Sequence, residues 1–238
     1  GQKPESLSKM IIPSTFIQKN YQGYSINIPS GWEIFNYGQC SELGLVSRDP
    51  NNPKRSFFYY GIGGYCYLTY QQKQIDDNYV AMGGIKSPLI GFPVISPFTP
   101  ENFLSNYYLV REVALTKQPG IILPELYNVQ IISISPVTQN LNNSSARSSL
   151  IRAVYSNKIK SIISEGLFLL TTQPMQIGTY GPGSSLGIVF SFIGITAPLG
   201  ELDAMITTAS NCIASFNIDP SYVNTVSYTH LTLPTIYS

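Results

Sequence analysis

The fold of this chain is decided by residues Leu167–Phe216, which include LFLLTT (167–172), GPGSSLG (181–187), IVFSFIGI (188–195) and PLGELDAMITTASNCIASF (198–216). The third segment is β-branched and aromatic with a single polar residue, which is typical of a central strand covered on both faces. The last segment predicts a helix, because its apolar residues recur in steps of three and four and so share one face. These residues are Leu199, Leu202, Met205, Ile206, Ala209, Ile213 and Phe216. A buried strand that leads into a one-sided helix indicates a sheet with a helix across it.

The start of this last helix is expected at Pro198, because the missing N–H of proline would have no partner in the first turn. Glu201 and Asp203 would then lie near the positive end of the helix dipole. Cys212 is expected on the core side of the helix as a small apolar residue.

The rest of the chain predicts further strands around two more helices. Strands are expected over residues 16–19, 24–28, 43–47, 56–60, 129–134, 149–155 and 159–172. Helices are expected over 67–82 and from Thr99, as N-cap, to about Leu115. The buried face of the helix over 67–82 should carry Leu68, Ile75, Tyr79 and Met82, and its outward face should carry Gln71, Gln72, Lys73, Asp76 and Asp77. The buried face of the helix that follows Thr99 should carry Phe103, Tyr107, Val110 and Ala114. Clustered strands with short hairpins predict an α+β fold, an antiparallel β-sheet with helices packed on its faces.

We expect one α+β domain over residues 14–224, preceded by a flexible lead-in over 1–13. Only 11% of the 238 residues are charged and the formal net charge is +1, so the composition gives no electrostatic footprint for nucleic acid or for an anionic membrane. No apolar run approaches 18 residues, so no transmembrane segment is expected. The chain begins at Gly1 without Met, so either an export signal has been removed or the chain is a piece of a longer protein.

The three cysteines leave two alternatives open. Cys40 and Cys66 flank predicted strands and could close a loop of about 26 residues, worth roughly 3 kcal/mol if the geometry permits. The other interpretation is three separate buried thiols, including Cys212. No pair has metal-ligand spacing such as C-x-x-C, so no metal site or cofactor is expected.

The C-terminal segment Val226–Ser238 is expected to be a non-native tail. Val226–Thr235 resembles the translated end of a transposase-type sequencing adapter. A segment of this origin is not expected to be part of the folded domain. His230 is the only histidine in the sequence. Without the tail, the native chain up to about Thr225 contains none.

Motifs for catalysis are weak. Gly183-Ser-Ser-Leu-Gly187 fits G-x-S-x-G with Ser185 as nucleophile, but an apolar strand follows it where a helix is needed, and a hairpin loop is the better interpretation. Gly61-Ile-Gly-Gly64 lacks the spacing of a phosphate-binding loop and is expected to be a flexible turn. Glu112 and Glu165 leave a two-carboxylate glycosidase open without pointing to it.

A group of tyrosines is the one candidate binding surface. Tyr59, Tyr60, Tyr65, Tyr67 and Tyr70 crowd around two glycine-rich segments. Tyrosine offers apolar area and a polar tip at low entropy cost, so such a group could stack on sugar rings or on a peptide. The alternative is that these residues belong to the core.

Three segments together carry a family resemblance: YQGYSINIPSGW (21–32), the Glu165-Gly-Leu strand, and ITAPLGE (195–201) leading to Ser215-Phe216. This set resembles the PsbP-like and DcrB-like proteins, often exported lipoproteins, whose domain is an antiparallel sheet between helices (an α/β/α sandwich). The resemblance implies that the matching residues pack the domain together. It implies no catalytic residue. Several such domains act as adaptors or assembly factors, although the long insert Cys40–Pro97 departs from their compact pattern.

The expected function is therefore a non-enzymatic extracytoplasmic binding or adaptor domain. Its partner is expected to be a protein or glycan at the cell surface, with secretion or anchoring through an N-terminal lipid signal that precedes Gly1. The alternative is a carbohydrate- or peptide-handling surface protein, including a hydrolytic one, that uses the Tyr59–Tyr70 region.

Overall fold

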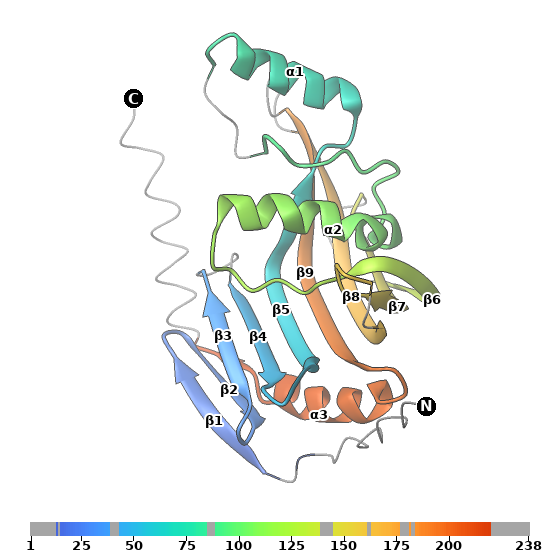
Figure 1. Ribbon diagram of the computed structural model, residues 1–238. Coiled ribbons are helices and arrows are strands. Elements are labelled where there is room, and N and C mark those ends of the chain that lie inside the picture. Colours follow the sequence, from blue (N-terminus) through green and yellow to red (C-terminus); the bar gives the residue numbers. More distant parts are fainter. Residues whose placement is uncertain are drawn as a thin grey trace.

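The structure, a computed structural model, describes residues 13, 15–38, 43–84, 89–138, 145–160, 163–176, 181 and 184–219 (Figure 1). Three of the features expected above lie outside these residues: Cys40, the lead-in up to residue 12, and the tail with His230. No helix in the described part of the chain has the length and hydrophobicity needed to cross a bilayer.

Within the described residues, seven strands form one large antiparallel sheet with the order β3-β4-β5-β9-β8-β7-β6. They are β3 (Glu33–Tyr37), β4 (Gly44–Asp49), β5 (Asn52–Cys66), β6 (Tyr127–Val137), β7 (Arg147–Ser156), β8 (Ile163–Gln176) and β9 (Ser185–Pro198). A small sheet contains β1 (Phe16–Tyr21), β2 (Tyr24–Pro29) and β10 (Asn217–Ile218). The helices are α1 (Tyr70–Ala81), α2 (Pro100–Lys117) and α3 (Leu202–Ala214). The predicted α+β class, with helices on an antiparallel sheet, is confirmed.

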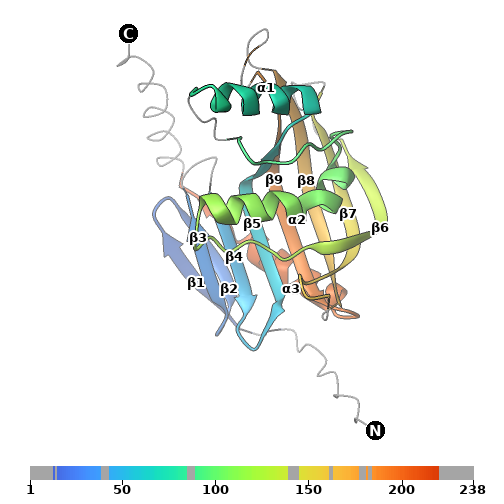
Figure 2. The same cartoon turned by 45° about the horizontal axis from the view of Figure 1, so that its top comes forward.

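The large sheet has a separate core on each face. Because side chains alternate along a strand, Phe57 of β5 packs with the α3 side, whereas its neighbour Phe58 packs with the α2 side. Figures 1 and 2 show α2 across one face of the sheet and α3 across the other. The small sheet contributes Ile26 and Ile28 to the α3 core. Buried strands with apolar residues on both faces follow from this three-layer arrangement.

Helix α2 begins as the sequence predicts. The Thr99 side chain accepts a hydrogen bond from the backbone N–H of Asn102, and Pro100 takes the first helical position. Phe103, Tyr107 and Val110 are buried on the sheet side. The predicted buried face is therefore confirmed at these three residues.

The expected start of the last helix at Pro198 is wrong. Pro198 is the final residue of β9 and pairs with Ser164, and the chain turns at Gly200, whose φ is +83°, before α3 begins at Leu202. A buried carboxylate on β8 holds this turn: Glu165 Oε1 accepts hydrogen bonds from the N–H groups of Gly200 and Leu202. Strand pairing therefore continues for three residues past Ile195, as far as Pro198, where the helical pattern was expected to begin.

The flexible turn expected at Gly61–Gly64 is also wrong, because β5 runs through it to Cys66. These residues pair with β9, with a register shift between Ile62 and Gly64. Glycines inside a strand often mark such an irregularity, where another element approaches closely.

The face predicted for α1 is wrong as well. Met82 is 80% exposed and Tyr79 is 41% exposed, whereas Asp76 and Gln72 are buried. Asp76 accepts hydrogen bonds from the Tyr67 hydroxyl (2.9 Å) and from Gln72 Nε2 (2.8 Å). Ser184 Oγ donates to Gln72 Oε1 at 2.9 Å. A polar network, and not an apolar stripe, holds this helix to the domain.

Candidate functional site

An apolar cavity lies between the C-terminal half of α2 and the large sheet. Its volume is about 680 Å³, which is within the range of pockets that bind small molecules. Its walls come from α2, β5, the first residues of β9 and the connecting segments around Phe92 and Ile121. The cavity thus opens where elements from distant parts of the sequence meet.

Glycine at position 64 lets α2 approach β5 beside this cavity. A Cβ atom there would lie 2.8 Å from Cγ1 of Val110 and 3.1 Å from Cζ of Phe103, and the φ of +152° disfavours other residues. Val110 itself lines the cavity. The close approach at Gly64 therefore fixes one wall.

Aromatic rings form much of the lining. Tyr65 and Phe92 make an edge contact with ring centroids 6.0 Å apart, and Tyr107 makes another with Phe192 at 5.2 Å. Tyr60, Tyr65, Phe92 and Tyr107 all line the cavity. Packed rings have few rotamers, so the wall is preorganised for an apolar ligand.

The lining residue Tyr107 carries a buried hydroxyl without a partner in the described part of the chain. Tyr107 is 1% exposed, and its hydroxyl has no hydrogen-bond partner among the described residues. Burial raises the pKa of this phenol, so it stays protonated and can donate. A buried hydroxyl without a partner costs about 1–3 kcal/mol.

Both charged residues among the described lining residues are cations. Arg111 is deep, with its side chain 11% exposed, and has carboxylate oxygens of Glu112 and Glu125 each at 3.6 Å. Lys117, the last residue of α2, is exposed, and its ammonium lies 5.7 Å from the centroid of the Phe92 ring. The two carboxylates compensate the charge of Arg111, so Lys117 is the cation of the described lining residues that has no ion pair.

A segment that we call the strap, residues 121–123, borders the cavity on one side. Its middle residue Ile122 donates its N–H to the Tyr37 hydroxyl (2.8 Å) and accepts a hydrogen bond from the Tyr60 hydroxyl (2.7 Å). Arg111 Nε donates to the carbonyl oxygen of Leu123 at 3.3 Å. Side chains from β3, β5 and α2 thus hold the strap in place.

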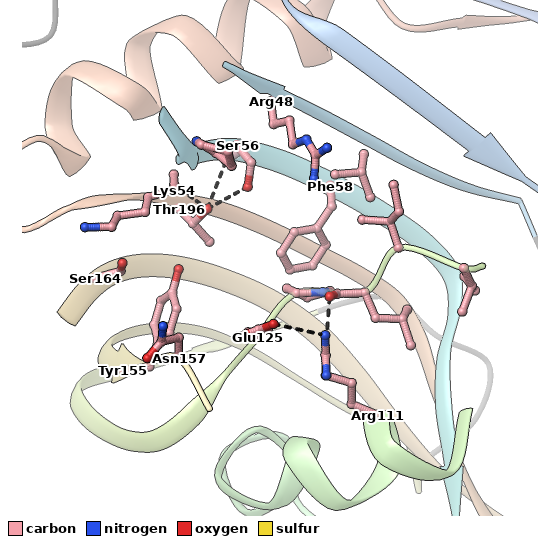
Figure 3. A pocket seen from close by; sticks show the side chains of 16 residues that line it. Arg48, Lys54, Ser56, Phe58, Arg111, Glu125, Tyr155, Asn157, Ser164 and Thr196 are labelled. Carbon is pink, nitrogen blue, oxygen red and sulfur yellow. Dashed lines mark hydrogen bonds and ion pairs between the residues drawn. The ribbon is translucent and has the colours of Figure 1, made fainter. Parts of the chain in front are cut away.

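A second, polar cavity of about 470 Å³ lies on the other side of the strap (Figure 3). Figure 3 shows the Ser56 and Thr196 hydroxyls at one end and the Arg111–Glu125 pair at the other. The two hydroxyls are 2.7 Å apart, and Thr196 Oγ1 also donates to the Lys54 carbonyl oxygen at 2.9 Å. These polar groups satisfy one another, so this cavity offers a weaker case for a ligand.

The two carboxylates considered for glycoside hydrolysis have structural contacts. Glu165 binds the start of α3 and lies 3.4 Å from Arg152 Nη2. Glu112 accepts hydrogen bonds from Tyr127 and Lys158, which lower the pKa of its carboxyl group. A lowered pKa is the opposite of what a general acid needs.

The five predicted tyrosines do not share one surface. Tyr60 and Tyr67 are buried, Tyr59 is half-buried on the α3 side, and Tyr70 is 79% exposed at the start of α1. Tyr60 and Tyr65 line the apolar cavity. The alternation of side chains along β5 separates Tyr59 from Tyr60, which explains why the group is divided between two faces.

Two other predicted features can be placed. Ser185 begins β9 opposite Gln176, and a strand follows it, so the geometry of a nucleophile elbow is not present there. Cys66 is buried in the core, and since Cys40 lies outside the described residues, the pairing of the two stays a prediction. The described residues contain no group of three or more His, Cys, Asp and Glu side chains that could hold a metal ion.

Sequence reasoning missed the cationic lining, although a signal for it exists. Tyr107, Val110 and Ala114 were expected on the buried face of α2, and Arg111 and Lys117 continue the same stripe in steps of three and four. Two cations on an otherwise apolar helix face indicate that positively charged side chains border a partly buried site.

No family model matches the chain, and no curated protein has a significant similarity to it. The functional argument therefore depends on the site alone.

Proposed function

We propose that this protein is a non-enzymatic binding domain that takes a small apolar ligand into the cavity between α2 and β5. One observation carries the proposal: an apolar cavity of about 680 Å³ is lined by packed aromatic rings, among them Tyr65, Phe92 and Tyr107. A mostly apolar pocket with few polar groups is the usual form of a small-molecule site. We further propose an extracytoplasmic location, which the low charge content and the resemblance to PsbP-like and DcrB-like domains support.

A binding role fits the polar groups better than catalysis does. The carboxylates near the cavity are engaged with Arg111, Tyr127 and Lys158. The lining provides hydroxyls and cations but no pair of nucleophile and base of the kind that acyl or glycosyl transfer requires.

The experiment is a titration of the full chain with N-phenyl-1-naphthylamine, a neutral dye whose fluorescence increases in apolar surroundings. Ala114 lines the cavity, so Ala114→Phe should occupy part of its volume and weaken dye binding about tenfold or more. Thr116 lies about 200° away around the helix and is exposed, so Thr116→Phe is the matched control.

We expect the wild type and Thr116→Phe to bind the dye alike. If Ala114→Phe also binds it with unchanged affinity while remaining folded by circular dichroism, the cavity is not the site and the proposal is wrong.

A further inference from the structure

We propose that the ligand of this cavity is an anionic amphiphile, a hydrocarbon chain with one carboxylate, whose head binds Lys117 at the mouth. This inference rests on the proposed function and specifies its ligand class. The charge of Lys117 carries it, since Glu112 and Glu125 compensate Arg111 and the described lining residues include no acid.

Lys117 is the cation that is available to a ligand. It makes no ion pair with any described residue, and its ammonium stands over the Phe92 ring at the edge of the apolar wall. Arg111, by contrast, donates to the strap and has two carboxylates nearby. The head of the ligand is therefore assigned to Lys117 and not to Arg111.

The helix dipole does not reverse this preference. Lys117 is in the last turn of α2, where the carbonyl ends carry about half a negative charge. The full positive charge of the ammonium exceeds that half charge, so the mouth stays net positive. A quaternary ammonium head would meet this same positive field and be disfavoured.

The length of the site follows from the helix that forms it. Lys117 and Tyr107 are ten residues apart on α2, which corresponds to about 15 Å along its axis. An extended chain advances about 1.2 Å per bond, so a chain of about 12 carbons reaches from the ammonium to the Tyr107 region. A medium-length chain therefore fits better than a short acid such as acetate.

The test is calorimetric titration of the full chain with dodecanoate, dodecanol and dodecyltrimethylammonium at about pH 8, where a carboxylate is ionised. The two ionic ligands are kept below their micelle-forming concentrations and dodecanol below its solubility in water. We expect dodecanoate to bind about five- to tenfold more tightly than dodecanol, as one charge-assisted contact allows, and the cation to bind most weakly. Lys117→Met keeps the apolar stem and should remove the preference for dodecanoate over dodecanol.

Lys73→Met is the matched control, because Lys73 lies on α1 and does not line the cavity; it should leave the preference unchanged. If dodecanol binds as tightly as dodecanoate, the anionic ligand class is wrong. If Lys117→Met keeps the preference for dodecanoate, the assignment of the head to Lys117 is wrong. In both cases the proposed apolar site stands. If none of the three chains binds, the proposed function fails and this inference fails with it.

Discussion

Tyr60 and Ile122, which are 62 residues apart in the sequence, are joined by a 2.7 Å hydrogen bond from the tyrosine hydroxyl to the backbone carbonyl oxygen. This bond ties the strap to the middle of β5. The hydroxyl of Tyr107 also lies in the α2 core, but it has no partner among the described residues. The two residues therefore form a natural pair for a mutational test.

Tyr60→Phe should destabilise the protein by about 1–2 kcal/mol, because it leaves the Ile122 carbonyl without its donor. Tyr107→Phe should be neutral or stabilising by up to about 1 kcal/mol, because it removes a buried hydroxyl that bonds to nothing. Urea unfolding of the ligand-free protein measures both. A loss of more than about 1 kcal/mol in Tyr107→Phe would show that its hydroxyl has a partner in the free protein.

The Gly64 site gives a second prediction. Gly64→Ala should cost about 1–3 kcal/mol, because the new Cβ would lie 2.8 Å from Val110 Cγ1 at a φ of +152°. A Cβ at Gly181 has no atom within 4 Å, so Gly181→Ala should change stability by no more than about 0.5 kcal/mol. Equal effects of the two variants in thermal unfolding would contradict the packing of α2 on β5.

The third prediction concerns the polar network beneath α1. Asp76→Asn replaces an acceptor with a donor where the Tyr67 hydroxyl and Gln72 Nε2 both donate, so it should cost about 1–3 kcal/mol. The neighbouring Asp77 pairs with Lys73 at the surface, and Asp77→Asn should stay within about 0.5 kcal/mol. Hydrogen exchange of the α1 amides should increase in the first variant only.

The sequence predicted α2 and most strands, because their patterns have one explanation. Tyr24, Ile26 and Ile28 alternate, and Thr99-Pro100 carries both a cap and a first-turn proline. The sequence missed β3 (Glu33–Tyr37), and the strand expected from residue 159 begins at Ile163. It failed at Pro198, Gly61–Gly64 and Asp76, where long-range contacts decide: pairing with β8, pairing with β9, and a buried hydroxyl from Tyr67. The site was predicted only in part: Tyr60 and Tyr65 belong to it, whereas Arg111 and Lys117 lie on α2, outside the predicted group of tyrosines.

A fourth prediction follows from the buried thiol of Cys212. Burial raises its pKa from the ordinary value of 9.0 to about 12. Below about pH 9 the thiol is protonated in both the folded and the unfolded chain, so it adds no pH dependence. Between about pH 9 and pH 12 the unfolded chain loses the proton first, and stability falls.

Urea unfolding at about pH 8 and about pH 10.5 should therefore show a loss in the wild type that exceeds the loss in Cys212→Ala by about 2 kcal/mol. The tyrosines with raised pKa values titrate in both proteins and cancel in this difference. Equal losses in the two proteins would show that Cys212 is not buried as a thiol.

The central claim is that the cavity between α2 and β5 is the binding site, and a crystal structure with a labelled ligand tests it most directly. Dodecanoate with a bromine on its last carbon marks the end of the chain through anomalous scattering. The account predicts a bromine peak beside Tyr107 and a carboxylate next to Lys117. A bromine peak in the polar cavity bounded by Ser56 and Thr196, or on the outer surface, would contradict it.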